Sequence, residues 1–252
     1  MEVKELEFSY GKEKVLNNIS FKIPRGKITT LIGANGCGKS TLFNVMTKNL
    51  RVHKGGVFLD GKNISEIPLK QFAKHVAIVH QYNVAPNDLT VGKLIGYGRI
   101  AHGGFYKKNK DEDEKLIQWA MEITNVVEFK DRQISDLSGG QKQRVWIAMA
   151  LAQNTKILFL DEPTTYLDIR YQIEILKLIK RLNKEFGITI ITVLHDINQA
   201  IHYSDEIIAM KDGKIIAQGA PKDVVTGKAI KEVYDIDLKI GKVDGSSFVL
   251  TV

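Results

Sequence analysis

Short β-rich hydrophobic runs and longer amphipathic segments alternate along this sequence. Over residues 15–23, hydrophobic positions near the end alternate with polar ones and Pro24 ends the run, which predicts a strand with one buried face. Short apolar runs bounded by turn residues predict further strands at 28–32, 56–59 and 76–80. The beginning of the chain is therefore expected to be rich in strands.

Helical spacing first appears at 40–50 and dominates between about residues 91 and 154. Within that stretch, hydrophobic residues recur at helical intervals over 114–123 and 141–152, and β-rich runs are missing. We expect a helical subdomain at about 89–154, inserted into an α/β core.

The mixed pattern then returns, with buried-strand runs at 157–160 and 188–194 on either side of a helix expected at 169–186. Strands that are buried on both faces and alternate with helices favour a mainly parallel sheet. Asp-Gly pairs between apolar runs predict tight hairpin turns. These pairs lie at 60–61, 212–213 and 244–245.

The composition is that of a folded globular protein, with 44% hydrophobic and 26% charged residues among 252. The single cysteine, Cys37, excludes a disulfide framework and favours a reducing compartment. No apolar run approaches the roughly 20 residues of a membrane-spanning helix and no signal-peptide pattern is evident, so a cytosolic protein is expected. The net charge of +7 is scattered, and the basic residues at 107–110 precede an acidic run, which favours a solvated loop over a nucleic-acid surface.

A phosphate loop of the form G-x-x-x-x-G-K-[ST] lies between an expected strand and an expected helix. Its glycines let backbone N–H groups wrap a polyphosphate, and the helix N-terminus adds a favourable dipole. Lys39 is expected to contact the β- and γ-phosphates and the Ser40 hydroxyl to bind magnesium, whereas a chance glycine-rich turn fits this context poorly. The predicted nucleotide-binding residues here are Gly33, Ala34, Asn35, Gly36, Cys37, Gly38, Lys39, Ser40 and Thr41.

Two carboxylates, Asp161 and Glu162, follow the buried-strand run 157–160. A pair at a strand end can place one carboxylate on magnesium and the other beside an attacking water. Asp161 suits the metal role, and Glu162 suits the base that polarises the water. Such a pair alone is more often a helix cap or a turn, but the phosphate loop shifts the balance toward catalysis.

A second glycine-rich turn, Leu137-Ser138-Gly139-Gly140-Gln141, precedes another expected helix. A serine hydroxyl and glycine N–H groups at a helix N-terminus form a second cradle for an anion. Considered alone, the segment is more simply a helix start with Ser138 as the N-cap.

With these three motifs in this order, the sequence resembles the nucleotide-binding subunits of ATP-binding cassette (ABC) transporters, whose signature is L-S-G-G-Q. The resemblance covers nearly the whole chain. It implies one nucleotide-binding domain with a P-loop NTPase (RecA-like) core at about 1–88 and 155–235, an N-terminal antiparallel β-subdomain, the inserted helical subdomain and a tail at 236–252.

The resemblance also implies a head-to-tail homodimer that binds ATP and Mg²⁺ between its subunits. Ser138 and Gly140 of one chain would hold the γ-phosphate of ATP bound by the other, with Gly139 and Gln141 in the same binding motif.

Five further positions match functional residues of that family. Tyr10 would stack on adenine with Val15 nearby, Gln81 would reach magnesium, Asp168 would couple the two ATP sites, and His195 would contact the γ-phosphate. Without the family context, Tyr10 is better interpreted as a core aromatic and His195 as a structural residue.

The residues Gly98, Arg99, His102 and Phe105 resemble a G-R-x-P-H segment of the ABC importers of ferric siderophores, haem and cobalamin, with Ala101 in place of the proline. The segments 163–168 and 194–200 are typical of the same group.

The resemblance implies an ATPase subunit at the cytoplasmic face of the membrane, working with permease subunits and indirectly with an extracytoplasmic substrate-binding protein. A ferric siderophore is the preferred cargo over haem or cobalamin. One alternative is a single-cassette ATPase with a non-transport partner, such as an iron–sulfur assembly factor. Another is a regulatory module that uses ATP only as a switch, which the presence of Glu162 and His195 disfavours.

Cys37 lies at a helix N-terminus, where a thiol pKa is expected to be lowered. We therefore expect maleimide to label Cys37 and saturating ATP to protect it. The tail after Asp237 is expected to add a small hairpin, to which no function is assigned.

Overall fold

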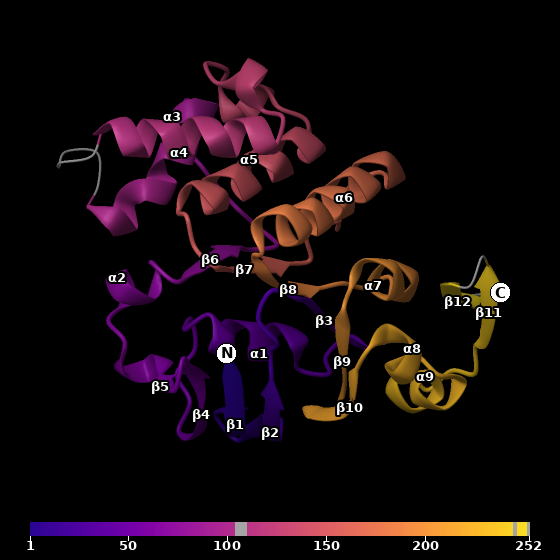
Figure 1. Cartoon of the computed structure of the whole chain (residues 1–252). Helices are drawn as coiled ribbons and strands as arrows, with labels where there is room; N and C mark the ends of the chain where they lie inside the picture. The colour runs from indigo at the N-terminus through magenta and orange to yellow at the C-terminus, as the bar shows by residue number, and fades with distance from the viewer. Residues whose placement is uncertain (104–109, 244–245, 251–252) are drawn as a thin grey trace. The chain divides into compact units, whose positions relative to one another are not determined.

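The computed structural model describes residues 1–103, 110–243 and 246–250 (Figure 1). The chain divides into two compact units. Unit 1 combines Met1–Ile67 with Asn183–Val252, and unit 2 is Pro68–Leu182. The helical subdomain predicted at 89–154 falls within unit 2, and its boundaries stay a prediction.

An antiparallel sheet opens unit 1, in the order β2-β1-β4-β5. Its strands are β1 (Glu2–Tyr10), β2 (Glu13–Lys22), β4 (Lys54–Leu59) and β5 (Lys62–Asn63), and a 3₁₀ turn (Ile64–Glu66) follows. The strands predicted at 15–23 and 56–59 are confirmed as β2 and β4.

Strand β1 was not predicted, because its buried residues do not alternate. Val3 and Leu6 are both buried, although they are three residues apart. Glu5 between them has a φ of 46°, and the pairing register with β2 shifts there. Because of this β-bulge, Val3 and Leu6 are both buried although an odd number of positions separates them. The alternation of buried and exposed residues that marks a strand is therefore absent from the sequence of β1.

The second sheet of unit 1 is mainly parallel, as the sequence predicted. Its strands follow the order β10-β9-β3-β8. Strand β3 (Ile28–Gly33) pairs in parallel with both β8 (Thr189–Val193) and β9 (Glu206–Lys211), and every residue of β3 and β8 is buried. β10 (Lys214–Gly219) pairs antiparallel with β9 through the predicted Asp-Gly turn.

Helix α1 (Lys39–Met46) follows β3 directly and is shorter than the helix predicted at 40–50. The helix stops because Lys48 adopts a left-handed conformation with a φ of 66°. The backbone N–H of Asn49 then donates to the Asn44 carbonyl at 2.8 Å, which satisfies an end carbonyl as helix C-caps do.

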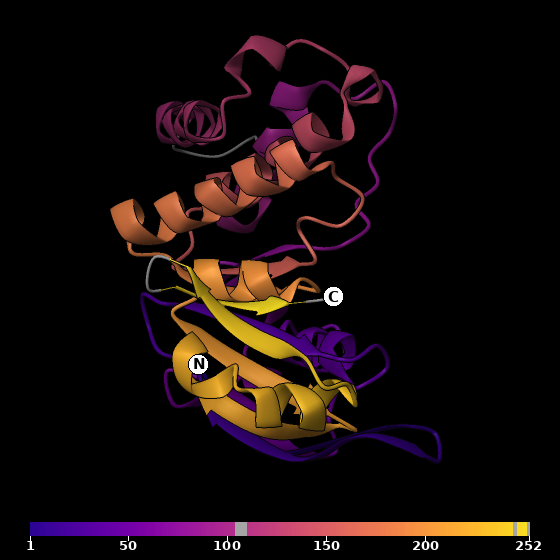
Figure 2. The same ribbon diagram turned by 90° about the vertical axis from the view of Figure 1, so that its right-hand side faces the viewer.

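The last part of unit 1 adds elements that the sequence pattern did not predict, apart from the terminal hairpin. They are α7 (Ile197–Tyr203), α8 (Pro221–Val224), α9 (Gly227–Tyr234), β11 (Lys239–Val243) and β12 (Ser246–Leu250). β11 and β12 pair antiparallel, and their predicted turn at 244–245 lies outside the described residues. The hairpin lies against α7 (Figure 2), where the Asn198 side chain donates to the Val249 carbonyl at 3.1 Å and accepts from the Val249 N–H at 2.7 Å.

Unit 2 contains the parallel strand pair β6 (Val76–Val79) and β7 (Ile157–Asp161) and most of the helices. The helices are α2 (Leu69–Phe72), α3 (Val91–Gly96), α4 (Lys110–Ile123), α5 (Gly139–Ala152) and α6 (Ile169–Phe186), with 3₁₀ turns at Tyr97–His102, Val127–Phe129 and Ile134–Asp136. α5 packs against both α3 and α4. The predicted strands at 76–80 and 157–160 and the predicted helix at 169–186 are confirmed.

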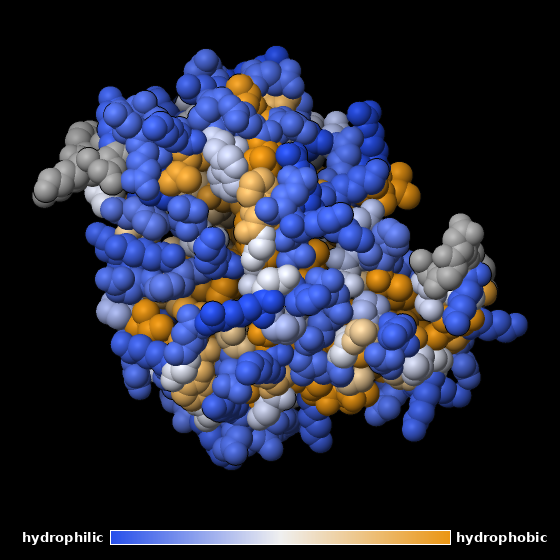
Figure 3. Space-filling view, in the orientation of Figure 1, coloured by the Kyte–Doolittle hydropathy of each residue, from blue (hydrophilic) through white to orange (hydrophobic). Residues whose placement is uncertain are grey.

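The surface shown in Figure 3 is mostly hydrophilic, with hydrophobic residues scattered over it. Among the described residues, none of the helices has the length and hydrophobicity that a bilayer crossing requires.

Two Asp-Gly hairpin turns offer a matched stability test. Gly61 and Gly213 have φ values of 83° and 70°, but a Cβ atom at Gly61 meets nothing within 4 Å, whereas one at Gly213 would lie 2.0 Å from the Val15 carbonyl oxygen. Gly61→Ala should cost about 1–2 kcal/mol for the left-handed backbone alone. Gly213→Ala should cost at least about 2 kcal/mol more, because the backbone of β2 must move. Urea denaturation measures both, and equal losses would contradict the close contact.

Candidate functional site

The phosphate loop (residues 33–41) is held in unit 1 by close backbone contacts. Gly33 and Gly38 have φ values of 152° and 104°, a region that glycine tolerates best. A Cβ atom at Gly33 would lie 2.4 Å from the Met210 carbonyl oxygen, and one at Gly38 would lie 3.2 Å from the Val15 carbonyl oxygen. The loop therefore needs glycine at these two positions to keep its shape.

Helix α1 begins without a side-chain cap. Its N-cap is Gly38, no acidic residue lies in its first turn, and its first residue is the cation Lys39. Helices α5, α7 and α9 instead begin with the capping side chains Ser138, Asp196 and Thr226. The first N–H groups of a helix need acceptors, and its positive end favours an anion. The start of α1 thus has the chemistry of an anion site.

Lys39 is 5% exposed, and its ammonium group donates to the Gly33 and Ala34 carbonyl oxygens at 2.9 Å each. These are backbone groups of the loop itself, so the lysine lies folded over the loop. Ser40 and Asn35 are exposed, and Thr41 is buried. The donors that a polyphosphate requires are therefore gathered at this one end of α1.

The other predicted site residues of unit 1 are Tyr10, Val15 and His195. Tyr10 is 52% exposed and its ring lies 4.9 Å from that of Phe8 in an edge-to-face arrangement, so it is not a core aromatic. Val15 lies beside Gly38 of the loop. His195 is exposed just after β8, and Asp196 next to it caps α7.

In unit 2, the structure brings Gln81 and Glu162 together. The Gln81 amide donates to Glu162 Oε2 at 2.5 Å, and the Thr165 hydroxyl donates to the same oxygen at 3.1 Å. Asp161 ends β7 and is half-buried. Glu162 has a φ of 48°, a conformation that is uncommon for a residue with a side chain and is enriched at functional sites.

The signature segment (residues 137–141) starts α5 with a capping box. The Gln141 N–H donates to Ser138 Oγ at 3.4 Å, and the Ser138 N–H donates to Gln141 Oε1 at 2.9 Å. The N-cap interpretation of Ser138 is therefore confirmed. It does not exclude an anion, because a cap side chain leaves other N–H groups of the first turn without intrahelical acceptors.

Asp168 and its neighbours lie against the same segment. Asp168 Oδ1 accepts from the Tyr171 N–H at 3.1 Å at the start of α6. A Cβ atom at Gly140 would lie 2.5 Å from the Tyr171 ring, whereas one at Gly139 would meet Leu167 at an ordinary 3.6 Å. Gly140 is thus the signature glycine that packing requires.

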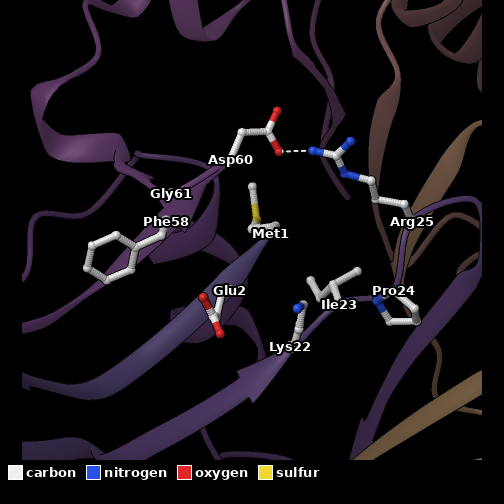
Figure 4. A pocket seen from close by; sticks show the side chains of 9 residues that line it. All are labelled: Met1, Glu2, Lys22, Ile23, Pro24, Arg25, Phe58, Asp60 and Gly61. Atoms are coloured by element: carbon white, nitrogen blue, oxygen red, sulfur yellow. Dashed lines mark hydrogen bonds and ion pairs between the residues drawn. The ribbon is translucent and has the colours of Figure 1, made fainter.

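A cavity of about 340 Å³ in unit 1 contains none of the predicted site residues (Figure 4). Met1, Ile23 and Phe58 contribute its apolar wall, and the ion pair of Arg25 with Asp60 lies at its edge. It adjoins the start of β1, whereas Tyr10 ends that strand.

Comparison with known proteins identifies the family. The family model described as ABC transporter matches residues 16–165. The chain belongs to the ABC transporter family. This agrees with the resemblance carried by the phosphate loop and the signature segment.

Two curated relatives are ATP-binding proteins whose names give an iron-chelate import or transport role. The chain is 48% identical to the iron(3+)-hydroxamate import ATP-binding protein FhuC of Bacillus subtilis, over 95% of this chain and 89% of that protein. It is 43% identical to the ferric enterobactin transport ATP-binding protein FepC of Escherichia coli, over 92% of this chain and 86% of that protein.

Solved structures of ABC cassettes have the same fold. One is cbiO1 of Clostridium perfringens, part of the ABC transporter complex cbiONQ, with a TM-score of 0.79 and 35% identity over 92% of each chain. Another is a dimeric bacterial ABC transporter cassette, with a TM-score of 0.75 and 28% identity over 87% of this chain and 98% of that chain. This chain is accordingly an ABC ATPase domain with the predicted P-loop NTPase fold.

In this ABC cassette, residues 98–102, which resemble the importer motif, contact the C-terminal end of α5. A Cβ atom at Gly98 would lie 2.2 Å from the Met149 carbonyl oxygen, so only glycine fits. Arg99 is 6% exposed and donates to the Ala152 carbonyl at 2.9 Å, and a His102 ring nitrogen lies 2.8 Å from the Gln153 carbonyl. Cationic or donor groups here satisfy the last carbonyls of the helix.

Arg99 also pairs with Asp113 of α4 at 2.6 Å, which compensates its buried charge. Burial and the neighbouring Arg99 both lower the pKa of His102. The sequence signalled the motif but not this arrangement, and Phe105 lies outside the described residues.

The expected lowering of the Cys37 pKa is wrong. Cys37 is 4% exposed, and burial raises the pKa of its thiol. The Lys39 ammonium, 3.9 Å from the sulfur, acts in the lowering direction but does not outweigh burial. A helix start lowers the pKa of a thiol only where burial does not outweigh the favourable charges around it.

Labelling of Cys37 by maleimide should consequently be slower in the folded protein than in the urea-unfolded chain by more than about tenfold. The rate should rise with pH beyond the range of an ordinary thiol, because the thiolate forms later. ATP should change this rate little, since the thiol is already covered. Rapid labelling at neutral pH with strong protection by ATP would contradict the burial.

Proposed function

We propose that this chain is the ATP-hydrolysing subunit of an ABC importer for ferric siderophores. The observation that carries the proposal is the uncapped, glycine-rich start of α1 with Lys39 folded over it, in a chain 48% identical to an iron(3+)-hydroxamate import ATP-binding protein. The relatives' printed functions supply the cargo class, and the loop supplies the nucleotide chemistry.

The residues of the site fit Mg-ATP. Backbone N–H groups of the phosphate loop and Lys39 would bind the β- and γ-phosphates, and the exposed Tyr10 would stack on the base with Val15 beside it. The Ser40 hydroxyl, the Gln81 amide oxygen and the Asp161 carboxylate would hold Mg²⁺, whose oxygen preference they satisfy. When bound, the ion would neutralise charge on the phosphates.

Glu162 would act as the base that orients and polarises the attacking water. In this structure its carboxylate accepts hydrogen bonds from Gln81 and Thr165, which fix its position. Because the bond to Glu162 is donated by the Gln81 amide nitrogen, the Gln81 amide oxygen would be available for Mg²⁺ while this bond is kept. His195 would donate to the γ-phosphate and so distinguish ATP from ADP.

A homodimer would complete each site. The signature segment of one chain, led by Ser138 and Gly140, would cover the γ-phosphate bound by its twin, and Asp168 would link the two sites. A related cassette has been solved as a dimer. Closure around ATP would drive permease subunits at the cytoplasmic face of the membrane, with cargo delivered by an extracytoplasmic binding protein, and hydrolysis would reset them.

Replacing the base should separate binding from hydrolysis. Glu162→Gln should lower the ATPase rate by more than about a hundredfold while ATP still binds, because the water loses its base. In excess Mg-ATP this variant should form dimers, measured by light scattering. Glu128 is exposed and is not one of the proposed site residues. Glu128→Gln therefore makes the same chemical change elsewhere and should leave the ATPase rate unchanged. Substantial turnover, or a strictly monomeric state, would contradict the assigned roles.

The cargo is tested in a complex with the permease. Co-purification of the subunit with its membrane partner, followed by reconstitution in vesicles, should give ATPase activity that rises with a ferric hydroxamate or ferric catecholate bound to the binding protein. If only haem or cobalamin raised the ATPase activity, the cargo would be that compound and the siderophore assignment would be wrong. Co-purification with soluble iron–sulfur assembly factors in place of a permease would favour the non-transport alternative.

A further inference from the structure

The segments that follow β6 and β7 in unit 2 leave the sheet side by side. The two strands pair in parallel, with Val79 opposite Leu160. Two residues further along each segment, the Gln81 amide donates to the Glu162 carboxylate at 2.5 Å. The residues after this first bridge therefore start from neighbouring positions.

A second bridge joins the same two segments. The hydroxyl oxygens of Tyr82 and Tyr166 lie 2.9 Å apart, so one phenol donates to the other. The two rings are tilted by 38° to each other, with their centroids 6.1 Å apart. Tyr82 is 68% exposed and Tyr166 is 81% exposed, so core packing does not force them together. Their contact depends on the hydrogen bond and on the facing rings.

The two bridges close a ring of contacts around one carboxylate oxygen. Glu162 Oε2 accepts from the Gln81 amide and from the Thr165 hydroxyl. Tyr82 is the next residue after Gln81, and Tyr166 is the next residue after Thr165. Both donors to the carboxylate are thus followed directly by the two phenols that bond each other.

The turn between Glu162 and Tyr166 needs such support. Glu162 and Tyr166 have φ values of 48° and 63°, and the Thr165 N–H donates to the Glu162 carbonyl between them at 3.2 Å. A left-handed backbone is unfavourable for a residue with a side chain and persists only where surrounding contacts hold it. The bond to Tyr82 is a contact of this kind for Tyr166.

We propose that Tyr82 and Tyr166 are positioning residues for Glu162. Their bridge fixes the far end of the turn that begins at Glu162, and it also holds the two donors, Gln81 and Thr165, on the same carboxylate oxygen. The inference rests on the proposed hydrolysis of ATP with Glu162 as the base. Neither phenol acts on the attacking water, and the pair works only through the place and direction of the carboxylate.

Two exposed tyrosines can also meet without functional consequence, because an exposed hydrogen bond exchanges readily with water and adds little to stability. The closed ring distinguishes the two cases. If the bridge matters only for stability, its loss leaves the reaction unchanged. If it positions Glu162, its loss lowers the rate of hydrolysis but not the binding of ATP, since the phosphate loop and Tyr10 belong to unit 1.

The test removes the bond and keeps the rings. Tyr82→Phe and Tyr166→Phe should each lower kcat about fivefold with a nearly unchanged KM for ATP, as expected for one lost hydrogen bond. Because both hydroxyls form one bond, the double variant should lose no more than either single variant. The matched control is Tyr97→Phe, an exposed tyrosine of unit 2 outside both segments, which should leave kcat unchanged. An unchanged or raised kcat in the single variants, or fully additive losses, would overturn the role of the pair.

Hydrogen exchange gives a readout that does not depend on turnover. The Thr165 N–H closes the turn on the Glu162 carbonyl, so it should exchange with deuterium faster in Tyr82→Phe and Tyr166→Phe than in wild type and in Tyr97→Phe. Equal exchange in all four proteins would show that the turn does not depend on the bridge, which would overturn the proposal.

The two proposals fail in different ways. If wild type does not hydrolyse ATP, or Glu162→Gln hydrolyses it as fast as wild type does, the proposed function fails. If hydrolysis requires Glu162 but kcat is the same in wild type, Tyr82→Phe and Tyr166→Phe, only the positioning role fails.

Discussion

The start of α1 sets the constraint on which the rest of unit 1 depends. A helix that begins with glycine and lysine presents several N–H donors and a cation at its positive end. This arrangement is unfavourable until an anion lies among them, and it persists only where surrounding structure holds it. β3 and β9 supply that structure, together with the Gly213 turn, whose N–H donates to the Cys37 carbonyl at 3.0 Å.

In unit 2, the first N–H groups of α5 find acceptors within the chain, because this helix begins with a capping box. α5 is closed at its N-terminus by Ser138 with Gln141 and at its C-terminus by Arg99 and His102. The signature segment is therefore the capped first turn of a helix whose last carbonyls are also hydrogen-bonded to side chains.

Sequence patterns predicted the elements whose burial is uniform or strictly periodic. β3, β7 and α6 are of this kind, and their ranges were close to those observed. β1 was missed because a bulge disturbs its alternation. α8 and α9 were missed because four and eight residues carry too little periodicity.

For the candidate site, too, the sequence predicted the features that have a local signal and missed those that depend on distant residues. The phosphate loop and the signature segment were found because glycine spacing and helix starts have local signals. The state of Cys37 was predicted wrongly, since burial is decided by distant residues.

The reciprocal amide pairing of Asn198 with Val249 ties the last strand of the chain to the helix that begins just after His195. A pull on β12 is passed to α7 through two hydrogen bonds that share one side chain. A fusion partner or affinity tag attached after β12 would therefore exert force on α7, the helix that begins just after His195. A label at the other terminus, or an internal one in unit 2, would leave that linkage mechanically undisturbed.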